Sequence, residues 1–247
     1  MAHHNPMVVA NWKMNTSLAD ATVLTQSIVH ALDAGIQADI VLAPPFVWLY
    51  PVKEIITALH HAHIHVGAQT MHEKEEGPYT GEISAMMLKR IADYVLLGHS
   101  ERAPCGETPE KVNQKVKRAL EWNINPIVFA GEETHSTPVS KLLDTLDTLL
   151  NGVAKTDYNK LTIVYEPVWA ISSLAHAQAI TGHALEVVTD AVRKHVGEEP
   201  RILYGGSVSA SNVSQFMHLP TVDGVVVGSA SLKAKEFIEI CSLVSAA

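Results

Sequence analysis

The chain has 247 residues, of which 47% are hydrophobic and 18% are charged, a composition that can bury a core and that excludes a disordered or fibrous protein. Its formal net charge of -8 disfavours nucleic acid and anionic membrane surfaces as partners. The two cysteines, Cys105 and Cys241, lie far apart without metal-ligand spacing, which favours free thiols in a reducing compartment.

The sequence carries no sign of a targeting or membrane segment. The amino terminus lacks the basic stretch and apolar run of a secretory signal, and no apolar stretch approaches the ~20 residues that span a bilayer. We therefore expect a cytoplasmic protein that binds neither membrane nor nucleic acid. Because no Gly/Ser-rich or Pro-rich linker divides the chain, residues 1–247 are expected to form a single domain.

Short β-branched runs recur along the chain, and a longer amphipathic stretch follows each of them. Such units imply parallel strands joined by helical crossovers, and eight of them in one domain predict a closed (β/α)8 barrel of eight parallel strands ringed by helices. The strands are expected to begin near Met7, Asp39, His63, Tyr94, Asn125, Leu161, Arg201 and Gly224.

Two kinds of helix signal accompany this pattern. One face carries leucines at helical period and predicts a stripe that packs against the barrel, formed by Leu142, Leu146, Leu149 and Leu150. Thr108-Pro109 and Thr137-Pro138 each combine a capping hydroxyl with a proline at the first helical position, so they predict two helix starts.

Polar residues at the strand ends are the candidates for chemistry, because only the carboxyl-end rim of such a barrel brings side chains from several strands together. Two-residue alternation after the first strand sends Asn11 and Lys13 to one side. His99 follows the fourth strand, and Glu166 follows the sixth. A partly buried glutamate there has a raised pKa and can take and return a proton. Taken singly, these residues also fit an ion-paired lysine, an inert histidine and a salt-bridged glutamate.

Glycine-bearing turns follow the last two predicted strands, Gly205-Gly206-Ser207 after the seventh and Gly228-Ser229 after the eighth. Backbone N–H groups at a helix start, approached through small residues, form a phosphate site, and these two loops are its usual place in such barrels. A merely tight turn is the alternative at each position.

Taken together, these segments resemble the triosephosphate isomerase family, a family of TIM barrels. The likeness covers nearly the whole chain. The matching segments, in family order, are Asn11–Asn15, Thr80–Ser84, Gly98–Arg102, Tyr165–Ile171, Tyr204–Val208 and Asp223–Gly224.

The resemblance implies interconversion of dihydroxyacetone phosphate and glyceraldehyde 3-phosphate through an enediolate, without metal or organic cofactor. It implies that Glu166 is the base that moves the carbon-bound proton and that neutral His99 polarises the carbonyl, a pairing for which this family is known. Lys13 and Asn11 are implied to bind substrate and stabilise oxyanion charge, with Glu101 as a supporting partner.

The resemblance also implies where the phosphate binds and how the chain assembles. A homodimer is expected through the loop that carries Thr80-Gly81-Glu82. The implied phosphate-binding residues are Asn11, Lys13, Ser172, Ser207, Gly205, Gly206, Gly228 and Ser229.

The chain departs from the family pattern near the phosphate and the lid. Ser172-Ser173-Leu174-Ala175 replaces the usual Gly-Thr-Gly-Lys of the lid tip, and Ser229 replaces a glycine. Ala103 replaces an arginine, the segment to Glu107 is one residue short, and Phe129 stands where the family commonly has cysteine. These changes predict a weaker grip on phosphate and a lower turnover.

Other interpretations of the sequence stay open at this point. The histidines His60, His61, His63 and His65 could form a metal site, but no cysteine or supporting pattern accompanies them, so no metal is expected. A barrel that binds phosphorylated metabolites or a protein partner with little or no turnover is the alternative function, and an engineered scaffold is another. Lys13, His99 and Glu166 together favour catalysis.

Overall fold

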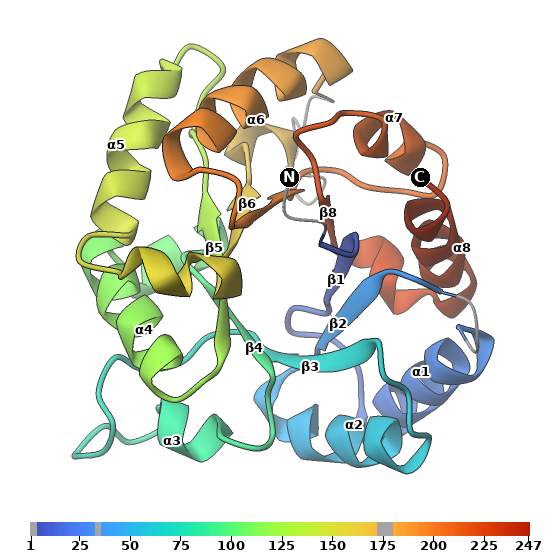
Figure 1. Ribbon diagram of the computed structural model, residues 1–247. Coiled ribbons are helices and arrows are strands. Elements are labelled where there is room, and N and C mark those ends of the chain that lie inside the picture. Colours follow the sequence, from blue (N-terminus) through green and yellow to red (C-terminus); the bar gives the residue numbers. More distant parts are fainter. Residues whose placement is uncertain (1–3, 33–35, 172–179) are drawn as a thin grey trace.

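The computed structural model describes residues 4–32, 36–171 and 180–247 (Figure 1). Its eight parallel strands close into one barrel in chain order, with β8 paired to β1, which confirms the predicted (β/α)8 barrel. Six strands begin where predicted, and β3 and β6 each begin one residue later. The strands are β1 (Met7–Asn11), β2 (Asp39–Ala43), β3 (Ile64–Ala68), β4 (Tyr94–Leu97), β5 (Asn125–Ala130), β6 (Thr162–Tyr165), β7 (Arg201–Tyr204) and β8 (Gly224–Val227).

Helices surround the barrel on all sides in Figure 1. Among the described residues, no helix combines the length and apolar character needed to cross a bilayer. The α-helices are α1 (Leu18–Ala31), α2 (Phe46–Ala58), α3 (Ala85–Leu88), α4 (Pro109–Glu121), α5 (Val139–Leu149), α6 (Gly182–Val196), α7 (Val213–Met217) and α8 (Ala234–Ser245). The short 3-10 helices are η1 (Ser100–Cys105), η2 (Lys155–Lys160), η3 (Val168–Ala170) and η4 (Ser229–Leu232).

The two predicted helix starts have different outcomes. The Thr108 hydroxyl accepts the N–H of Lys111 and Pro109 opens α4, as predicted. The prediction for Thr137 was wrong by one residue: Pro138 occupies the capping position and α5 begins at Val139. The Thr137 hydroxyl instead contacts the Thr134 hydroxyl at 3.1 Å, so a local turn takes the group that was expected to cap the helix.

Strand alternation divides the core into two apolar clusters. One fills the centre of the barrel and includes Val9, Leu96 and Phe129. The other lies between the strands and the helices and includes the predicted leucine stripe of α5, whose members are all buried. Because side chains fill the barrel centre, polar chemistry is confined to the ends of the barrel.

Candidate active site

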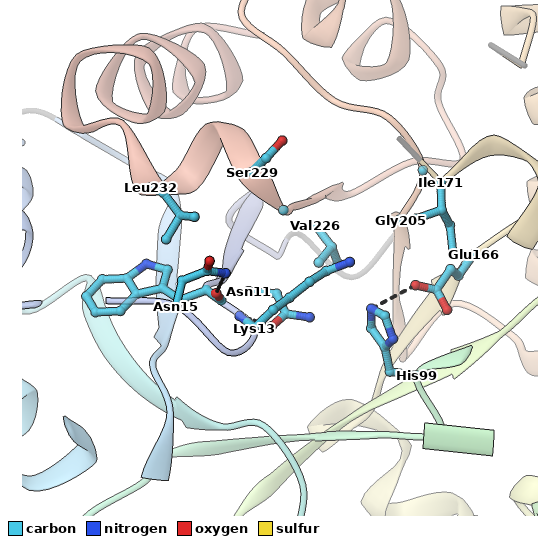
Figure 2. Close-up of a pocket in the computed structure, with 13 residues that line it drawn as sticks. Asn11, Lys13, Asn15, His99, Glu166, Ile171, Gly205, Val226, Ser229 and Leu232 are labelled. Atoms are coloured by element: carbon cyan, nitrogen blue, oxygen red, sulfur yellow. Dashed lines mark hydrogen bonds and ion pairs between the residues drawn. The ribbon is translucent and has the colours of Figure 1, made fainter. Parts of the chain in front are cut away.

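A cavity of about 350 Å³ opens at the carboxyl ends of the strands (Figure 2). It gathers residues from the ends of β1, β4, β6, β7 and β8, which are far apart in the sequence. Figure 2 shows that the side chains of Lys13, His99 and Glu166 point toward this common space. The lining residues are Asn11, Trp12, Lys13, Asn15, His99, Glu166, Ile171, Gly205, Gly206, Val226, Gly228, Ser229 and Leu232.

Lys13 lies just beyond β1 and has a left-handed backbone with φ of 53°. Two hydrogen bonds hold this turn: the Lys13 N–H donates to Asn11 Oδ1 at 3.0 Å, and the Lys13 carbonyl accepts from Gln69 Nε2 at 2.8 Å. The ammonium Nζ lies 2.6 Å from Glu101 Oε1. Strand alternation ends at Asn11, where β1 ends. The strained turn and the ion pair with Glu101 therefore place the Lys13 ammonium.

His99 is buried directly after β4. Its Nδ1 accepts the backbone N–H of Glu101 at 3.2 Å, so in the neutral ring the proton is assigned to Nε2. That Nε2 lies 3.0 Å from Glu166 Oε1. Burial lowers the pKa of His99 to about 4, with Glu101 opposing this shift and Lys13 adding to it. The imidazole is therefore neutral at neutral pH and offers an N–H to the cavity.

Glu166 is held by contacts on both its backbone and its carboxylate. The backbone N–H donates to Ala130 O at 2.9 Å, and Oε2 accepts the N–H of Ser100 at 3.0 Å. Burial raises the pKa of this carboxyl group to about 7, against the opposing effect of the Ser100 hydrogen bonds. A carboxyl group that titrates near neutrality can both take up and return a proton.

Two glycines allow the chain to close around Glu166. A Cβ at Gly131 would lie 1.8 Å from the Glu166 carbonyl oxygen. A Cβ at Gly205 would lie 2.6 Å from Val164 Cγ1 and 3.5 Å from Glu166 Cβ. Any larger residue at either position would displace the strand end that carries the carboxylate, which explains glycine there.

Six of the eight predicted phosphate-binding residues line the same cavity: Asn11, Lys13, Gly205, Gly206, Gly228 and Ser229. Ser229 begins η4, and the first N–H groups of a helix have no acceptor within that helix. These groups lie at the same cavity as the Lys13 ammonium, where a negatively charged group is favoured.

Two other predicted phosphate-binding residues stand apart from this set. Both the N–H and the hydroxyl of Ser207 donate to the Ala170 carbonyl, at 3.1 and 3.0 Å, so these donors are used within the protein. Ser172 lies outside the described residues, together with Ser173, Leu174 and Ala175. The roles of Ser207 and Ser172 stay predictions.

A second cavity of about 570 Å³ lies between the ends of β4 to β6 and the helices α4 and α5. Three glutamates line this second cavity: Glu107, Glu133 and Glu166. No lysine, arginine or histidine of the described chain lines it. An anionic ligand is therefore favoured in the smaller cavity beside Lys13 and disfavoured in this one.

The histidine cluster shows no metal geometry in the described part of the chain. No group of three or more His, Cys, Asp or Glu side chains there stands close enough to hold an ion. His61 Nε2 instead contacts the Leu32 carbonyl at 2.9 Å, and the ring of His65 lies edge-on to that of Tyr94. These two histidines have protein partners at the amino-terminal part of the barrel.

Comparison with known proteins identifies the family. The model of the family described as triosephosphate isomerase matches residues 6–244. The chain belongs to the triosephosphate isomerase family. Proteins named triosephosphate isomerase from Dehalococcoides mccartyi and Carboxydothermus hydrogenoformans are 38% and 39% identical to it, over 95% of this chain and 94% and 97% of theirs. One from Clostridium botulinum is 38% identical, over 95% and 97% of the two chains.

In this member of the triosephosphate isomerase family, sequence reasoning missed six residues that line or support the cavity: Trp12, Asn15, Gln69, Ile171, Val226 and Leu232. Gln69 donates to the carbonyls of Lys13 and Ala43, at 2.8 and 2.9 Å, and so ties the ends of β1, β2 and β3 together. Its place directly after a predicted strand could have identified it. Ile171, Val226 and Leu232 line the cavity, but apolar residues carry no chemical signal in a sequence.

Proposed function

We propose that this chain interconverts dihydroxyacetone phosphate and glyceraldehyde 3-phosphate by proton transfer through an enediolate. One observation carries this proposal: a neutral His99 and a Glu166 carboxyl group with raised pKa lie 3.0 Å apart, in the cavity that also holds the Lys13 ammonium. A base, a neutral hydrogen-bond donor and a fixed positive charge are the groups that enolisation next to a carbonyl requires.

The contact between His99 and Glu166 indicates how the groups act in turn. In the structure, Nε2–H of His99 faces Glu166. A substrate carbonyl oxygen that takes this N–H frees the carboxylate to accept the proton of the neighbouring carbon. The enediolate oxygens then lie near His99 and Lys13, where His99 moves protons between them. Glu166 returns its proton to the other carbon, so the sum of the steps is an isomerisation.

The charge distribution fits this sequence of steps. A neutral imidazole is closer in acidity to an enediol than an imidazolium is, so it suits reversible exchange of a proton between the oxygens. Lys13 supplies the permanent positive charge to the same anion, and Glu101, 2.6 Å away, holds its ammonium in position. Asn11 and the backbone N–H groups at Gly206, Gly228 and Ser229 complete the proposed substrate site. The Gly205 N–H donates to the Tyr165 carbonyl at 2.9 Å, so Gly205 contributes to the cavity wall.

The decisive experiment is a coupled isomerase assay on the purified protein, run in both directions. We expect turnover with both triose phosphates and no requirement for added metal or organic cofactor. If the protein binds phosphate-bearing analogues but turns neither substrate over, the alternative of a phosphometabolite-binding barrel is correct and the isomerase proposal is wrong.

We propose that turnover lies below that of ordinary family members because of the segment Ser172-Ser173-Leu174-Ala175. Glycine reaches left-handed backbone angles that other residues adopt only at a cost of ~1 kcal/mol or more each. Replacing these four residues by Gly-Thr-Gly-Lys should raise kcat/KM and the affinity for an enediolate analogue together. If both stay unchanged in the graft, these residues do not limit the enzyme.

We also propose a homodimer. Exposed methionines and a valine occur in three successive strand–helix units: Met14 after β1, Val47 in α2, and Met86 and Met87 in α3. The loop with Thr80-Gly81-Glu82 lies between β3 and α3 in the chain. Apolar side chains exposed together favour contact with a partner surface. Light scattering at micromolar concentration should give twice the 26.8 kDa chain mass, and the monomer mass alone would exclude the dimer.

We further propose that the enzyme works in the cytoplasm and without a resident metal. Fractionation of the source cells tests the first point. Unchanged turnover after dialysis against a chelator is the expected result for the second, whereas loss of turnover that a divalent cation restores would contradict it.

A further inference from the structure

We propose that Phe129 is a positioning residue that holds the His99 imidazole in the orientation in which Nε2 faces Glu166 and the substrate cavity. The proposal rests on the proposed function and deepens it, because it assigns a role in the reaction to a residue that does not line the substrate cavity.

The barrel topology places Phe129 on the strand between the two strands that lead to the reacting groups. Strand β5 lies between β4, which leads to His99, and β6, which leads to Glu166. Phe129 is paired with Val164, two residues before Glu166, and belongs to the cluster that fills the barrel centre. Its side chain is 2% exposed. The ring therefore forms part of the floor beneath the catalytic pair.

The ring contact defines what Phe129 does to His99. The two ring centroids are 5.0 Å apart with the planes tilted by 53°, within the range of favourable aromatic pairs. The imidazole is held at its edge by the Glu101 N–H, which donates to Nδ1, and by the 3.0 Å contact between Nε2 and Glu166 Oε1. Phe129 packs against the ring itself, so these edge contacts and the packing together restrict the rotation of the imidazole.

The same contact keeps water from the imidazole. Burial is the largest cause of the lowered pKa of His99, and a phenyl ring against the imidazole contributes to that burial. Cysteine, which the family commonly has at this position, is smaller and has no ring to pack in this way. In this chain Phe129 therefore links core packing to the protonation state of the catalytic histidine.

The test compares Phe129→Leu and Phe129→Cys with the control Ile127→Ala. Ile127 is a fully buried, inward-facing residue of the same strand, and it makes no ring contact with His99. For both Phe129 variants we expect kcat to fall roughly 10-fold or more with KM little changed, because the substrate contacts remain. The 15N NMR titration of His99 should move to higher pH. The control should lose stability but keep both the His99 titration and kcat.

Two results would overturn the proposal. One is an unchanged His99 titration in both folded Phe129 variants. The other is a control that moves kcat and the titration as far as the Phe129 variants do, which would make the effect a general loss of core packing. The NMR titration needs no turnover, so it tests Phe129 even if the parent protein proves inactive and the proposed function fails.

Discussion

The two ends of the barrel hold carboxylates in opposite ways. At the amino-terminal end, aspartates beside the strand starts pair with cationic side chains, and two of them also accept strand N–H groups, from Val66 at 3.0 Å and Ile202 at 2.7 Å. The pairs are Asp39 with Arg201 at 2.5 Å, Asp93 with Lys53 at 3.0 Å and Asp223 with Arg193 at 2.5 Å.

At the carboxyl-terminal end, Glu166 is buried more deeply but faces a neutral imidazole and the N–H of Ser100. Among the described residues, no lysine or arginine side chain lies within hydrogen-bond distance of the Glu166 carboxylate. The comparison teaches that burial and a paired cation together decide the role of a carboxylate. The partly exposed aspartates, each paired with a cation, fix the fold, whereas burial without a paired cation leaves Glu166 able to exchange a proton near neutral pH.

The largest expected effect is on turnover in Glu166→Gln. The amide cannot accept the carbon-bound proton, so kcat should fall on the order of 10²–10⁴-fold or more while the fold stays intact. Steady-state kinetics and circular dichroism on the same sample check both parts. Near-normal kcat in the folded variant would remove Glu166 from its proposed role.

A somewhat smaller loss is expected for Lys13→Met, which removes the positive charge and keeps most of the apolar stem. Because the charge stabilises the enediolate, kcat/KM should fall about 10²–10³-fold and the affinity for an enediolate analogue should fall with it. Calorimetric titration of the analogue measures the second effect, and unchanged affinity would contradict the assignment of Lys13.

The pH dependence of kcat/KM should show one group on the acid side. Only ionised Glu166 accepts a proton, so the rate should fall about tenfold per pH unit below its pKa of about 7. His99, with a pKa of about 4, stays neutral between pH 5 and 7, so it causes no further fall in rate over this range. The substrate phosphate also titrates at about pH 6, so its ionisation is divided out of the profile; a slope of two decades per unit that remains in that range would show that His99 also titrates there.

At the opposite rim, Asp223→Ala should lower stability and leave the chemistry alone. The change removes the acceptor of Arg193 and of the Ile202 N–H, which should cost about 2–3 kcal/mol of unfolding free energy. Denaturant unfolding gives this value. A large loss of kcat with no loss of stability would contradict the division of roles between the two rims.

The smallest expected effect is a gain of stability in Glu166→Gln above pH 7. Because folding raises the pKa of Glu166 from 4.5 to about 7, the folded state holds an extra proton between these values and loses stability as the pH rises through them. The glutamine avoids this cost, so the variant should be about 1–3 kcal/mol more stable than the parent at pH 8. Equal stability at pH 8 would show that the burial of Glu166 is compensated.

Local sequence signals predicted the elements better than their exact ends. The start of α4 at Thr108-Pro109 was confirmed, but the same signal at Thr137-Pro138 placed α5 one residue early because Thr134 offered the hydroxyl a nearer partner. Capping signals depend on competing side chains nearby, and these are visible only once the loop is folded.

The sequence by itself determined the barrel, since eight β-branched runs alternating with amphipathic stretches leave few other ways to bury the apolar faces. It also supplied the candidates Asn11, Lys13, His99 and Glu166, because reactive residue types stand out at strand ends. The tertiary structure alone decided that Phe129 contacts His99, that Gln69 holds Lys13 and that Ser207 bonds to Ala170. These contacts join residues far apart in the chain, and the distances and burial that set the two pKa values exist only when the strands have closed.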